Sequence, residues 1–194
     1  MRTPRGYMWI AAIAVLVVLG ALWIWMNYFQ TYHLATVDTM RLYRDGFRSL
    51  REFRTAIADV NPKTVIPLID ADERKQSPFD EEDDFCRRSR IKIIGVPVKL
   101  GGWPAQADVK RFLEFAANPK YQPVLVHCAQ GVRRTGMMVA AYQMSVLKWD
   151  KEKTKGAILT FGHSRRSIGD VEKFIDGYDP VTMATVTDLP VSAE

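Results

Sequence analysis

Two patterns of apolar and polar residues divide the chain. Residues 7–29 are almost continuously apolar and carry no charge. Farther on, helix-like and strand-like segments alternate. Apolar side chains gathered on one helical face predict amphipathic or buried helices over 47–60, 104–117 and 137–149. Short apolar runs rich in β-branched residues predict strands over 64–69, 91–98 and 124–127.

This alternation predicts an α/β fold. Strands that alternate with helices imply right-handed crossovers and a central, mostly parallel sheet flanked by helices, with 124–127 as a central strand. The chain has 194 residues and is 47% hydrophobic, which is enough for one globular domain. We expect a tether over 30–38, the domain over 39–178, and a flexible tail over 179–194.

The apolar run at the N-terminus predicts a single-pass transmembrane helix, with a membrane anchor over residues 1–29. The run is long enough to cross a hydrocarbon core of about 30 Å, and aromatic residues lie near both of its ends. A cleaved signal peptide is the alternative. Arg2 and Arg5 precede the run, which favours a cytoplasmic N-terminus and a domain on the far, extracytoplasmic side. The arginines at 44, 48, 51 and 54 favour the opposite orientation, which stays open.

Residues 127–136, which read His-Cys-Ala-Gln-Gly-Val-Arg-Arg-Thr-Gly, carry the candidate chemistry. They follow one apolar run and precede another, so they predict a loop between a buried strand and a helix. Backbone N–H groups in such a loop can form an anion-binding nest, and the helix start adds partial positive charge. Gly131 supplies a backbone conformation that a β-carbon would disfavour.

Four side chains define what this loop can do. Cys128 lies among N–H groups, a helix start and arginines, which favour its nucleophilic thiolate form. Arg134 lies far enough along the loop for its guanidinium to return over the sulfur and bind two phosphate oxygens. The Thr135 hydroxyl is placed to donate to the thiolate, and His127 is interpreted as a buried orienting group.

The pattern His-Cys-x-x-Gly-x-x-Arg-Thr-Gly resembles the signature of the cysteine-based protein tyrosine phosphatase superfamily, specifically its dual-specificity branch. The segments 42–46, 63–69 and 93–98 resemble those of small atypical dual-specificity phosphatases of bacteria, plants and fungi. The resemblance covers residues 39–177 and implies a protein tyrosine phosphatase-like fold. It also implies a phosphoric monoester hydrolase that forms a phosphocysteine intermediate and requires no metal or organic cofactor.

The resemblance assigns roles by position. Cys128 is the expected nucleophile, and Arg134 is expected to stabilise the phosphoryl oxygens. The expected substrate-binding residues are the rest of the loop and its flanks: His127, Ala129, Gln130, Gly131, Val132, Arg133 and Thr135.

The general acid has no clear candidate. The family places an aspartate upstream of the cysteine to protonate the leaving group, but residues 96–105 contain no acid. Asp108 is the nearest candidate, with a helix-start acid as its alternative role, and Asp170 is a more remote one. Without a strong acid, a phenol with a pKa of about 10 leaves more readily than an alkyl alcohol. This favours phosphotyrosine over phosphoserine.

Other functions compete with a protein phosphatase. The predicted anchor, the net charge of +5 and Arg133 favour a lipid phosphate, such as a phosphoinositide or phosphatidylglycerophosphate, as the rival substrate. The missing acid favours a catalytically impaired module that binds phosphorylated partners.

Nucleic-acid binding is excluded because basic and acidic residues are interspersed. The acidic run 80–84 predicts a helix start and no metal site, and Cys86 is either a resolving thiol or a buried spectator.

Overall fold

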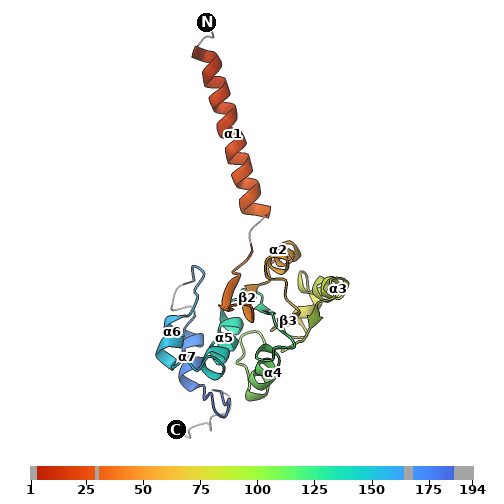
Figure 1. Ribbon diagram of the computed structural model, residues 1–194, viewed down its shortest axis with the longest axis vertical. Coiled ribbons are helices and arrows are strands. Elements are labelled where there is room, and N and C mark those ends of the chain that lie inside the picture. Colours follow the sequence, from red (N-terminus) through yellow and green to blue (C-terminus); the bar gives the residue numbers. More distant parts are fainter. Residues whose placement is uncertain (1–3, 29–30, 164–167, 186–194) are drawn as a thin grey trace.

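The centre of the domain is a five-stranded mixed sheet in the computed structural model, which describes residues 4–28, 31–163 and 168–185 (Figure 1). The strands, in the spatial order β1-β2-β5-β3-β4, are β1 (Ala35–Asp38), β2 (Leu42–Gly46), β5 (Val124–Cys128), β3 (Thr64–Pro67) and β4 (Lys92–Ile93). Only β1 runs antiparallel to its neighbour. The predicted α/β architecture with a central β5 is confirmed, as a mixed sheet flanked by helices.

One face of the sheet is covered by α2 (Leu50–Val60) and α3 (Glu82–Arg88). Phe53 of α2 and Cys86 of α3 pack there against Val65 and Leu125 of the sheet. The Ser49 hydroxyl oxygen accepts the Glu52 N–H and begins α2, as an N-cap residue should. This apolar layer holds the two helices against that face of the sheet.

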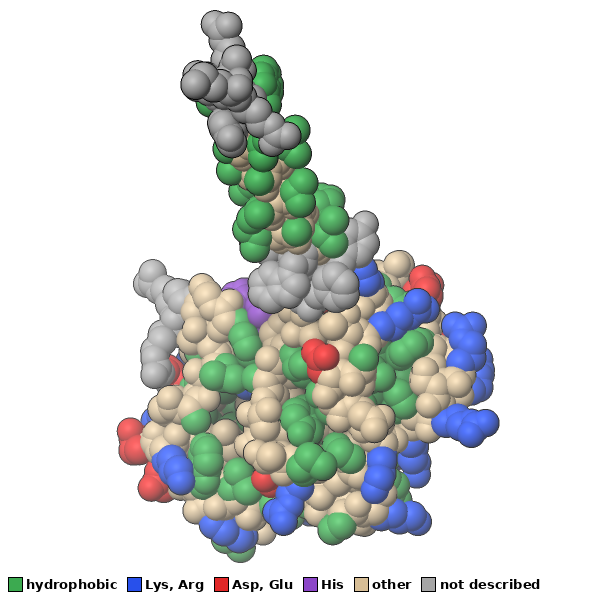
Figure 2. Space-filling model, turned by 45° about the horizontal axis from the view of Figure 1, so that its top comes forward, with side chains coloured by type: hydrophobic (Ala, Val, Ile, Leu, Met, Phe, Trp, Pro, Cys, Tyr) green, Lys and Arg blue, Asp and Glu red, His purple; other side chains and the backbone are tan. Residues whose placement is uncertain are grey.

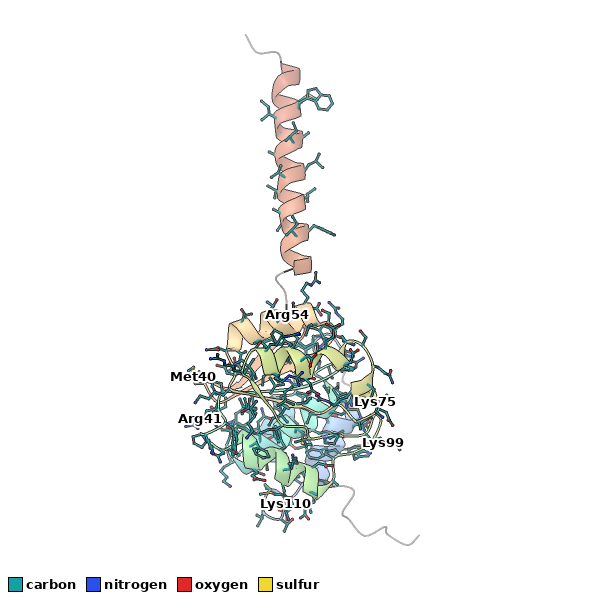
Figure 3. The ribbon with its side chains drawn as sticks, turned by 90° about the vertical axis from the view of Figure 1, so that its right-hand side faces the viewer. Met40, Arg41, Arg54, Lys75, Lys99 and Lys110 are labelled. Carbon is teal, nitrogen blue, oxygen red and sulfur yellow. The ribbon has the colours of Figure 1, made fainter. Side chains whose placement is uncertain are left out.

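The opposite face is covered by four helices: α4 (Gln106–Ala116), α5 (Arg133–Ser145), α6 (Lys151–Gly156) and α7 (Gly169–Gly177). Phe112, Met137 and Phe174 pack against Val124 and Val126 in the main core. Figure 3 shows the resulting layers, with Arg54 of α2 and Lys110 of α4 at opposite sides of the domain. As predicted, α5 follows the loop at 129–132 and packs into the core.

The chain between β3 and α4 contains two short 3-10 helices, η1 (Glu73–Lys75) and η2 (Phe79–Glu81), before α3. The strand predicted over 91–98 is regular only in β4. Ile94 and Val96 still donate their N–H groups to carbonyls of Val65 and Pro67, at 3.0 and 3.1 Å. Pro67 of β3 has no N–H to donate back towards this segment, so the regular ladder between β3 and β4 does not extend past it. The extended segment nevertheless leads the chain along the sheet to the site.

Both ends of the domain extend farther than the sequence predicted. The expected tether contains β1, which pairs with β2. Thr185, in the expected tail, is buried and its hydroxyl donates to the Pro104 carbonyl at 2.9 Å. Residues 179–185 therefore pack against the segment before α4, while 186–194 lie outside the described residues.

The N-terminal helix α1 (Pro4–Tyr28) stands apart from the sheet and exposes apolar side chains (Figure 2). Across the described residues, no helix reaches the length and hydrophobicity that crossing a membrane demands. The predicted transmembrane anchor over 1–29 and the predicted membrane localisation, with its orientation, are therefore wrong.

Candidate active site

The loop that joins β5 to α5 turns tightly against the end of β2. Gly131 has a φ of +66°, and a β-carbon there would lie 2.5 Å from the carbonyl oxygen of Asp45. The Phe47 N–H, just beyond β2, donates to the carbonyls of Cys128 and Ala129 at 3.0 Å each. The position therefore requires glycine both for its backbone conformation and for its close approach to β2.

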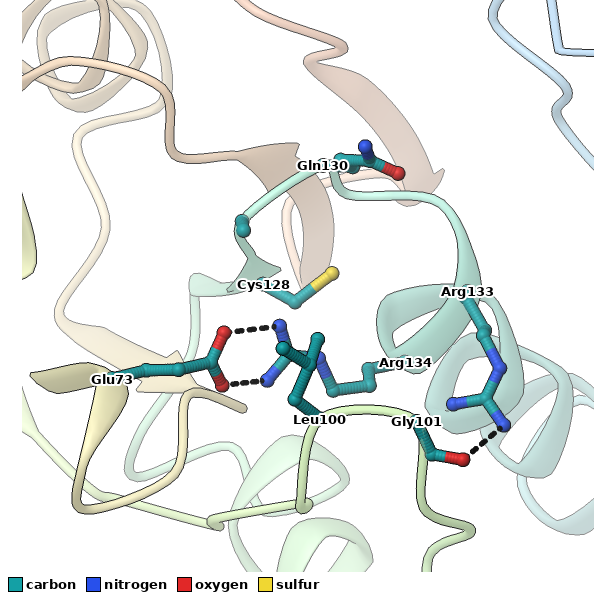
Figure 4. Close-up of a pocket in the computed structure, with 8 residues that line it drawn as sticks. Glu73, Leu100, Gly101, Cys128, Gln130, Arg133 and Arg134 are labelled. Carbon is teal, nitrogen blue, oxygen red and sulfur yellow. Dashed lines mark hydrogen bonds and ion pairs between the residues drawn. The ribbon is translucent and has the colours of Figure 1, made fainter.

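The sulfur of Cys128 lies in a cavity of about 340 Å³. The Gly131 N–H donates to it at 3.2 Å, and the residue is only 3% exposed. Figure 4 shows the cavity with its lining residues, which are Glu73, Leu100, Gly101, Cys128, Ala129, Gln130, Arg133 and Arg134. The cavity thus combines a cysteine sulfur that accepts a backbone N–H with the side chains of two arginines.

Arg134 folds back from α5 so that its guanidinium lies beside Cys128 (Figure 4). Its Nη1 and Nη2 atoms donate to the two carboxylate oxygens of Glu73, the Nη2–Oε1 distance being 3.0 Å. Nη1 also donates to the carbonyls of Leu68 and Val98, at 3.3 and 3.2 Å. Burial by itself lowers the pKa of Arg134, but the hydrogen bonds to Glu73 and the charge of Cys128 raise it overall. The guanidinium is therefore held, charged, at the wall of the cavity.

Glu73, the first residue of η1, is a site residue that the sequence analysis missed. It contacts Arg134 across 61 positions of sequence, and it belongs to a locally charged run, Glu-Arg-Lys. Neighbouring Asp70 accepts the Leu100 N–H at 3.1 Å, which ties η1 to the segment before α4. No local pattern predicts either contact.

Arg133 connects the loop to two other segments. Its Nε donates to Asp170 of α7 at 2.7 Å, and its Nη1 donates to the Gly102 carbonyl at 2.7 Å. Nη2 donates to the Gly101 carbonyl at 3.2 Å, and the guanidinium lies 5.4 Å from the Trp103 ring centroid. Most of its donors are therefore used to hold the segment 101–103 at the rim of the cavity.

The other predicted loop residues divide into two groups. Ala129 and Gln130 line the cavity together with Arg133. His127, Val132 and Thr135 are buried and do not line it. His127 shares a hydrogen bond of 2.8 Å with the buried carboxylate of Glu82, while the Thr135 hydroxyl has no hydrogen-bond partner within the described residues. The expected hydrogen bond from Thr135 to the sulfur is thus not formed here.

Neither of the two candidate general acids lines the cavity that holds the sulfur. Asp108 does not line the cavity, and its carboxylate accepts the Ala105 N–H at 2.9 Å at the start of α4. Asp170 is engaged by Arg133. The carboxylate that lines the cavity within the described part of the chain is Glu73. This carboxylate binds Arg134 through both of its oxygens.

The second cysteine is buried in the layer under α2 and α3. Burial raises the pKa of the Cys86 thiol to about 12, and the charge of Glu82 acts in the same direction. Such a thiol is a poor nucleophile near neutral pH. This environment favours the spectator role over the resolving one.

Comparison with known proteins identifies the family. The family described as PTP-NADK, DSP-PTPase phosphatase fused to NAD+ kinase, matches residues 34–172. The chain belongs to this family of DSP-PTPase phosphatases. The predicted resemblance and the prediction of a protein-tyrosine or dual-specificity type phosphatase are confirmed.

Individual relatives support this family assignment at low sequence identity. The chain is 27% identical over 148 residues to the putative tyrosine-protein phosphatase OCA1 of Debaryomyces hansenii, covering 72% of each. It is 24% identical over 97 residues to the probable chloroplastic NAD kinase 2 of Oryza sativa subsp. japonica, which is 50% of this chain and 10% of that protein. The chain thus spans only a tenth of that relative's length.

The fold also agrees with solved structures. The core catalytic domain of the PP-IP phosphatase SIW14 from S. cerevisiae superposes with a TM-score of 0.64 at 22% identity. The match covers 77% of this chain and 87% of that one. It confirms a phosphatase-like fold for the described domain.

Proposed function

We propose that this DSP-PTPase family member hydrolyses phosphate monoesters through a phosphocysteine intermediate. The Cys128 thiolate attacks phosphorus, an S–P bond forms, and the P–O bond to the leaving group breaks. Water then attacks phosphorus, breaks the S–P bond and releases inorganic phosphate. The observation that carries this proposal is the Cys128 sulfur, which accepts the Gly131 N–H and lines the same cavity as Arg134.

Arg134 and the loop supply the electrostatic stabilisation that phosphoryl transfer needs. Phosphoryl oxygens that carry charge in the transition state are stabilised by fixed N–H donors and a guanidinium. Glu73 and the carbonyls of Leu68 and Val98 keep Arg134 in place before substrate binds. The site is therefore preorganised for a tetrahedral dianion.

The leaving group receives no obvious proton from the protein. The segment 96–105 carries no acid, and both oxygens of Glu73 are occupied by Arg134. A weakly basic leaving group can depart without protonation, whereas an alkoxide cannot do so readily. We therefore propose aryl phosphates, phosphotyrosine among them, as better substrates than phosphoserine.

A series of substrates with increasingly basic leaving groups tests this proposal. We expect kcat/KM for the full chain to fall steeply from p-nitrophenyl phosphate through phenyl phosphate to an alkyl phosphate, and Asp108→Asn to leave the slope unchanged. Cys128→Ser removes turnover, while Cys86→Ala, a buried cysteine outside the cavity, is the matched control. A flat dependence on leaving group that becomes steep in Asp108→Asn would establish Asp108 as the acid and overturn this proposal.

The same assays separate the alternatives. A phosphate-binding module would show no turnover in the wild type, and it would bind phosphotyrosine equally well in the wild type and in Cys128→Ser. The lipid-phosphate alternative rested partly on the anchor that the structure contradicts, and Arg133 is engaged by Asp170. Hydrolysis of phosphatidylglycerophosphate in detergent with no release from phosphotyrosine peptides would nevertheless favour the lipid substrate.

A further inference from the structure

A second buried arginine lies beneath the phosphate-binding loop and comes from outside it. Arg44 is on β2 and is 3% exposed. It pairs in register with Val126 of β5, and Gly46 pairs with Cys128. Because side chains alternate along a strand, Arg44 projects to the same face of the sheet as Cys128. The strand register therefore places the Arg44 side chain on the face of the sheet that also carries Cys128.

The contacts of Arg44 converge on the loop. Its Nη2 donates to the Gly131 carbonyl at 2.6 Å, and the guanidinium lies 5.4 Å from the Phe161 ring centroid. Its Nε has no hydrogen-bond partner within the described residues. Gly131 is also the residue whose N–H donates to the Cys128 sulfur. One glycine thus connects the buried arginine to the nucleophile.

The Gly131 carbonyl bond also fixes a second amide. A trans peptide directs its N–H opposite to its C=O. The bond to Arg44 therefore sets the direction of the Val132 N–H, and it polarises that peptide. A lost Arg44 would free this peptide to rotate and would leave the buried Gly131 carbonyl without this donor.

Two opposing effects set the pKa of Arg44. Burial, the larger effect, lowers the pKa of Arg44 to about 10, and the negative charge of Cys128 acts in the opposite direction. Arg44 is therefore still protonated near neutral pH. Because Arg44 lies on the same face of the sheet as Cys128 and contacts the glycine whose N–H donates to the sulfur, its positive charge is placed to act on that sulfur.

We propose that Arg44 is a positioning residue that holds the loop at 129–132 through the Gly131 carbonyl and stabilises the Cys128 thiolate with its positive charge. Only the effect of Arg44 on turnover rests on the proposed function. The loop contact and the charge act on the sulfur whether or not a given substrate is hydrolysed.

Several other charged groups face the same region. Arg133 and Arg134 of α5 and Glu73 of η1 line the cavity with the sulfur. His33, in the segment before β1, shares a hydrogen bond of 2.7 Å with the Gln130 carbonyl. Burial is the main cause that lowers the pKa of His33, and the charge of Arg44 adds to it. Variants at position 44 keep all four groups, so they isolate the contribution of Arg44.

The pH dependence of Cys128 alkylation tests the inference without any substrate. The full chain is treated with iodoacetamide between pH 4.5 and 8, and the modified Cys128 peptide is quantified by mass spectrometry, apart from that of Cys86. The variants are Arg44→Met, Arg44→Lys and, as a matched surface control, Arg41→Gln, whose side chain is 60% exposed and labelled in Figure 3.

We expect Arg44→Met to move the midpoint of the profile to higher pH, with an about tenfold lower rate on its acid limb, the effect of one nearby opposite charge. Arg44→Lys keeps the charge, so its midpoint should stay close to that of the wild type, and Arg41→Gln should match the wild type. Arg44→Gln repeats the test if Arg44→Met does not fold.

A folded Arg44→Met or Arg44→Gln protein with the wild-type midpoint would overturn the proposal. A uniform loss of rate at every pH without a shifted midpoint would do so too, because it would indicate a purely structural role. A shifted midpoint in a chain that hydrolyses no phosphate ester would support Arg44 and refute the proposed function, so the two failures are distinguishable.

Discussion

Replacing Asp45 with asparagine tests how burial controls the carboxyl group behind the loop. Asp45 is completely buried on β2, where it pairs in register with His127. Burial is the main cause that raises its pKa to about 8 from its ordinary value of 3.8, and the charge of Glu52 contributes in the same direction. The Asp45→Asn side chain has a similar shape but stays neutral at every pH.

The sign and size of the effect follow from proton binding. Between about pH 4 and 8 the unfolded chain loses the Asp45 proton while the folded chain keeps it, so the stability of the wild type falls as pH rises. The difference between the two pKa values, at about 1.36 kcal/mol per pH unit, sets an upper limit of roughly 6 kcal/mol. Because buried sites relax, we expect Asp45→Asn to gain about 2 kcal/mol or more over the wild type at pH 7.5, and to match it near pH 4.

Urea unfolding of both proteins at pH 4.5, 6 and 7.5 measures the difference between their free energies of unfolding. The contributions of the other titrating groups are the same in both proteins and cancel in this difference. Asp59→Asn, an exposed acid on α2, is the control and should show a constant offset from the wild type. Parallel stability curves for Asp45→Asn and the wild type across this range would refute the reasoning, because they would show that Asp45 ionises normally inside the fold.

Two further predictions concern the loop and its arginine. Glu73→Ala leaves the buried Arg134 charge without its carboxylate, so the free energy of unfolding in urea should fall by about 2–3 kcal/mol, while Glu73→Gln should lose less; equal stability of all three proteins would contradict this. Gly131→Ala should reduce kcat/KM by about 100-fold or more, because its β-carbon meets the Asp45 carbonyl at 2.5 Å and displaces the loop. Gly156→Ala, with open space around its β-carbon, is the matched control and should keep wild-type kinetics; a similar loss in both variants would exclude the clash as the cause.

The strand, loop and helix around Cys128 could be predicted because their causes are local. The apolar run of β5, the glycine that permits a positive φ, and the helix that begins at Arg133 all lie within one stretch of sequence. The same locality placed Arg134 near the sulfur, since a loop of this length has few ways to connect a strand to a helix. Here consecutive residues determine both the local fold and the chemistry.

Contacts between distant segments could not be predicted in this way. β1 has weak strand character and forms by pairing with β2 across a short turn, so its residues alone indicate a tether. Glu73 reaches the site only because the chain from β3 to α4 folds over the end of the sheet. The N-terminal helix shows the converse error, because apolar composition alone suggested a membrane span that the described residues do not provide.

The missing acid and the role of Arg133 have one structural explanation. The segment 99–105 occupies the rim where the family's proton donor is expected, but its backbone is already bound from two sides, by Arg133 through the carbonyls of Gly101 and Gly102 and by Asp70 through the Leu100 N–H. These bonds hold the segment near the sulfur without contributing a carboxyl group. Because the cavity wall there is a leucine side chain and glycine backbone, this segment offers no carboxyl group to a leaving group. For the proposed function, we therefore expect selection among substrates to follow the basicity of the departing oxygen, which is a property of the ester and not of any residue in the cavity.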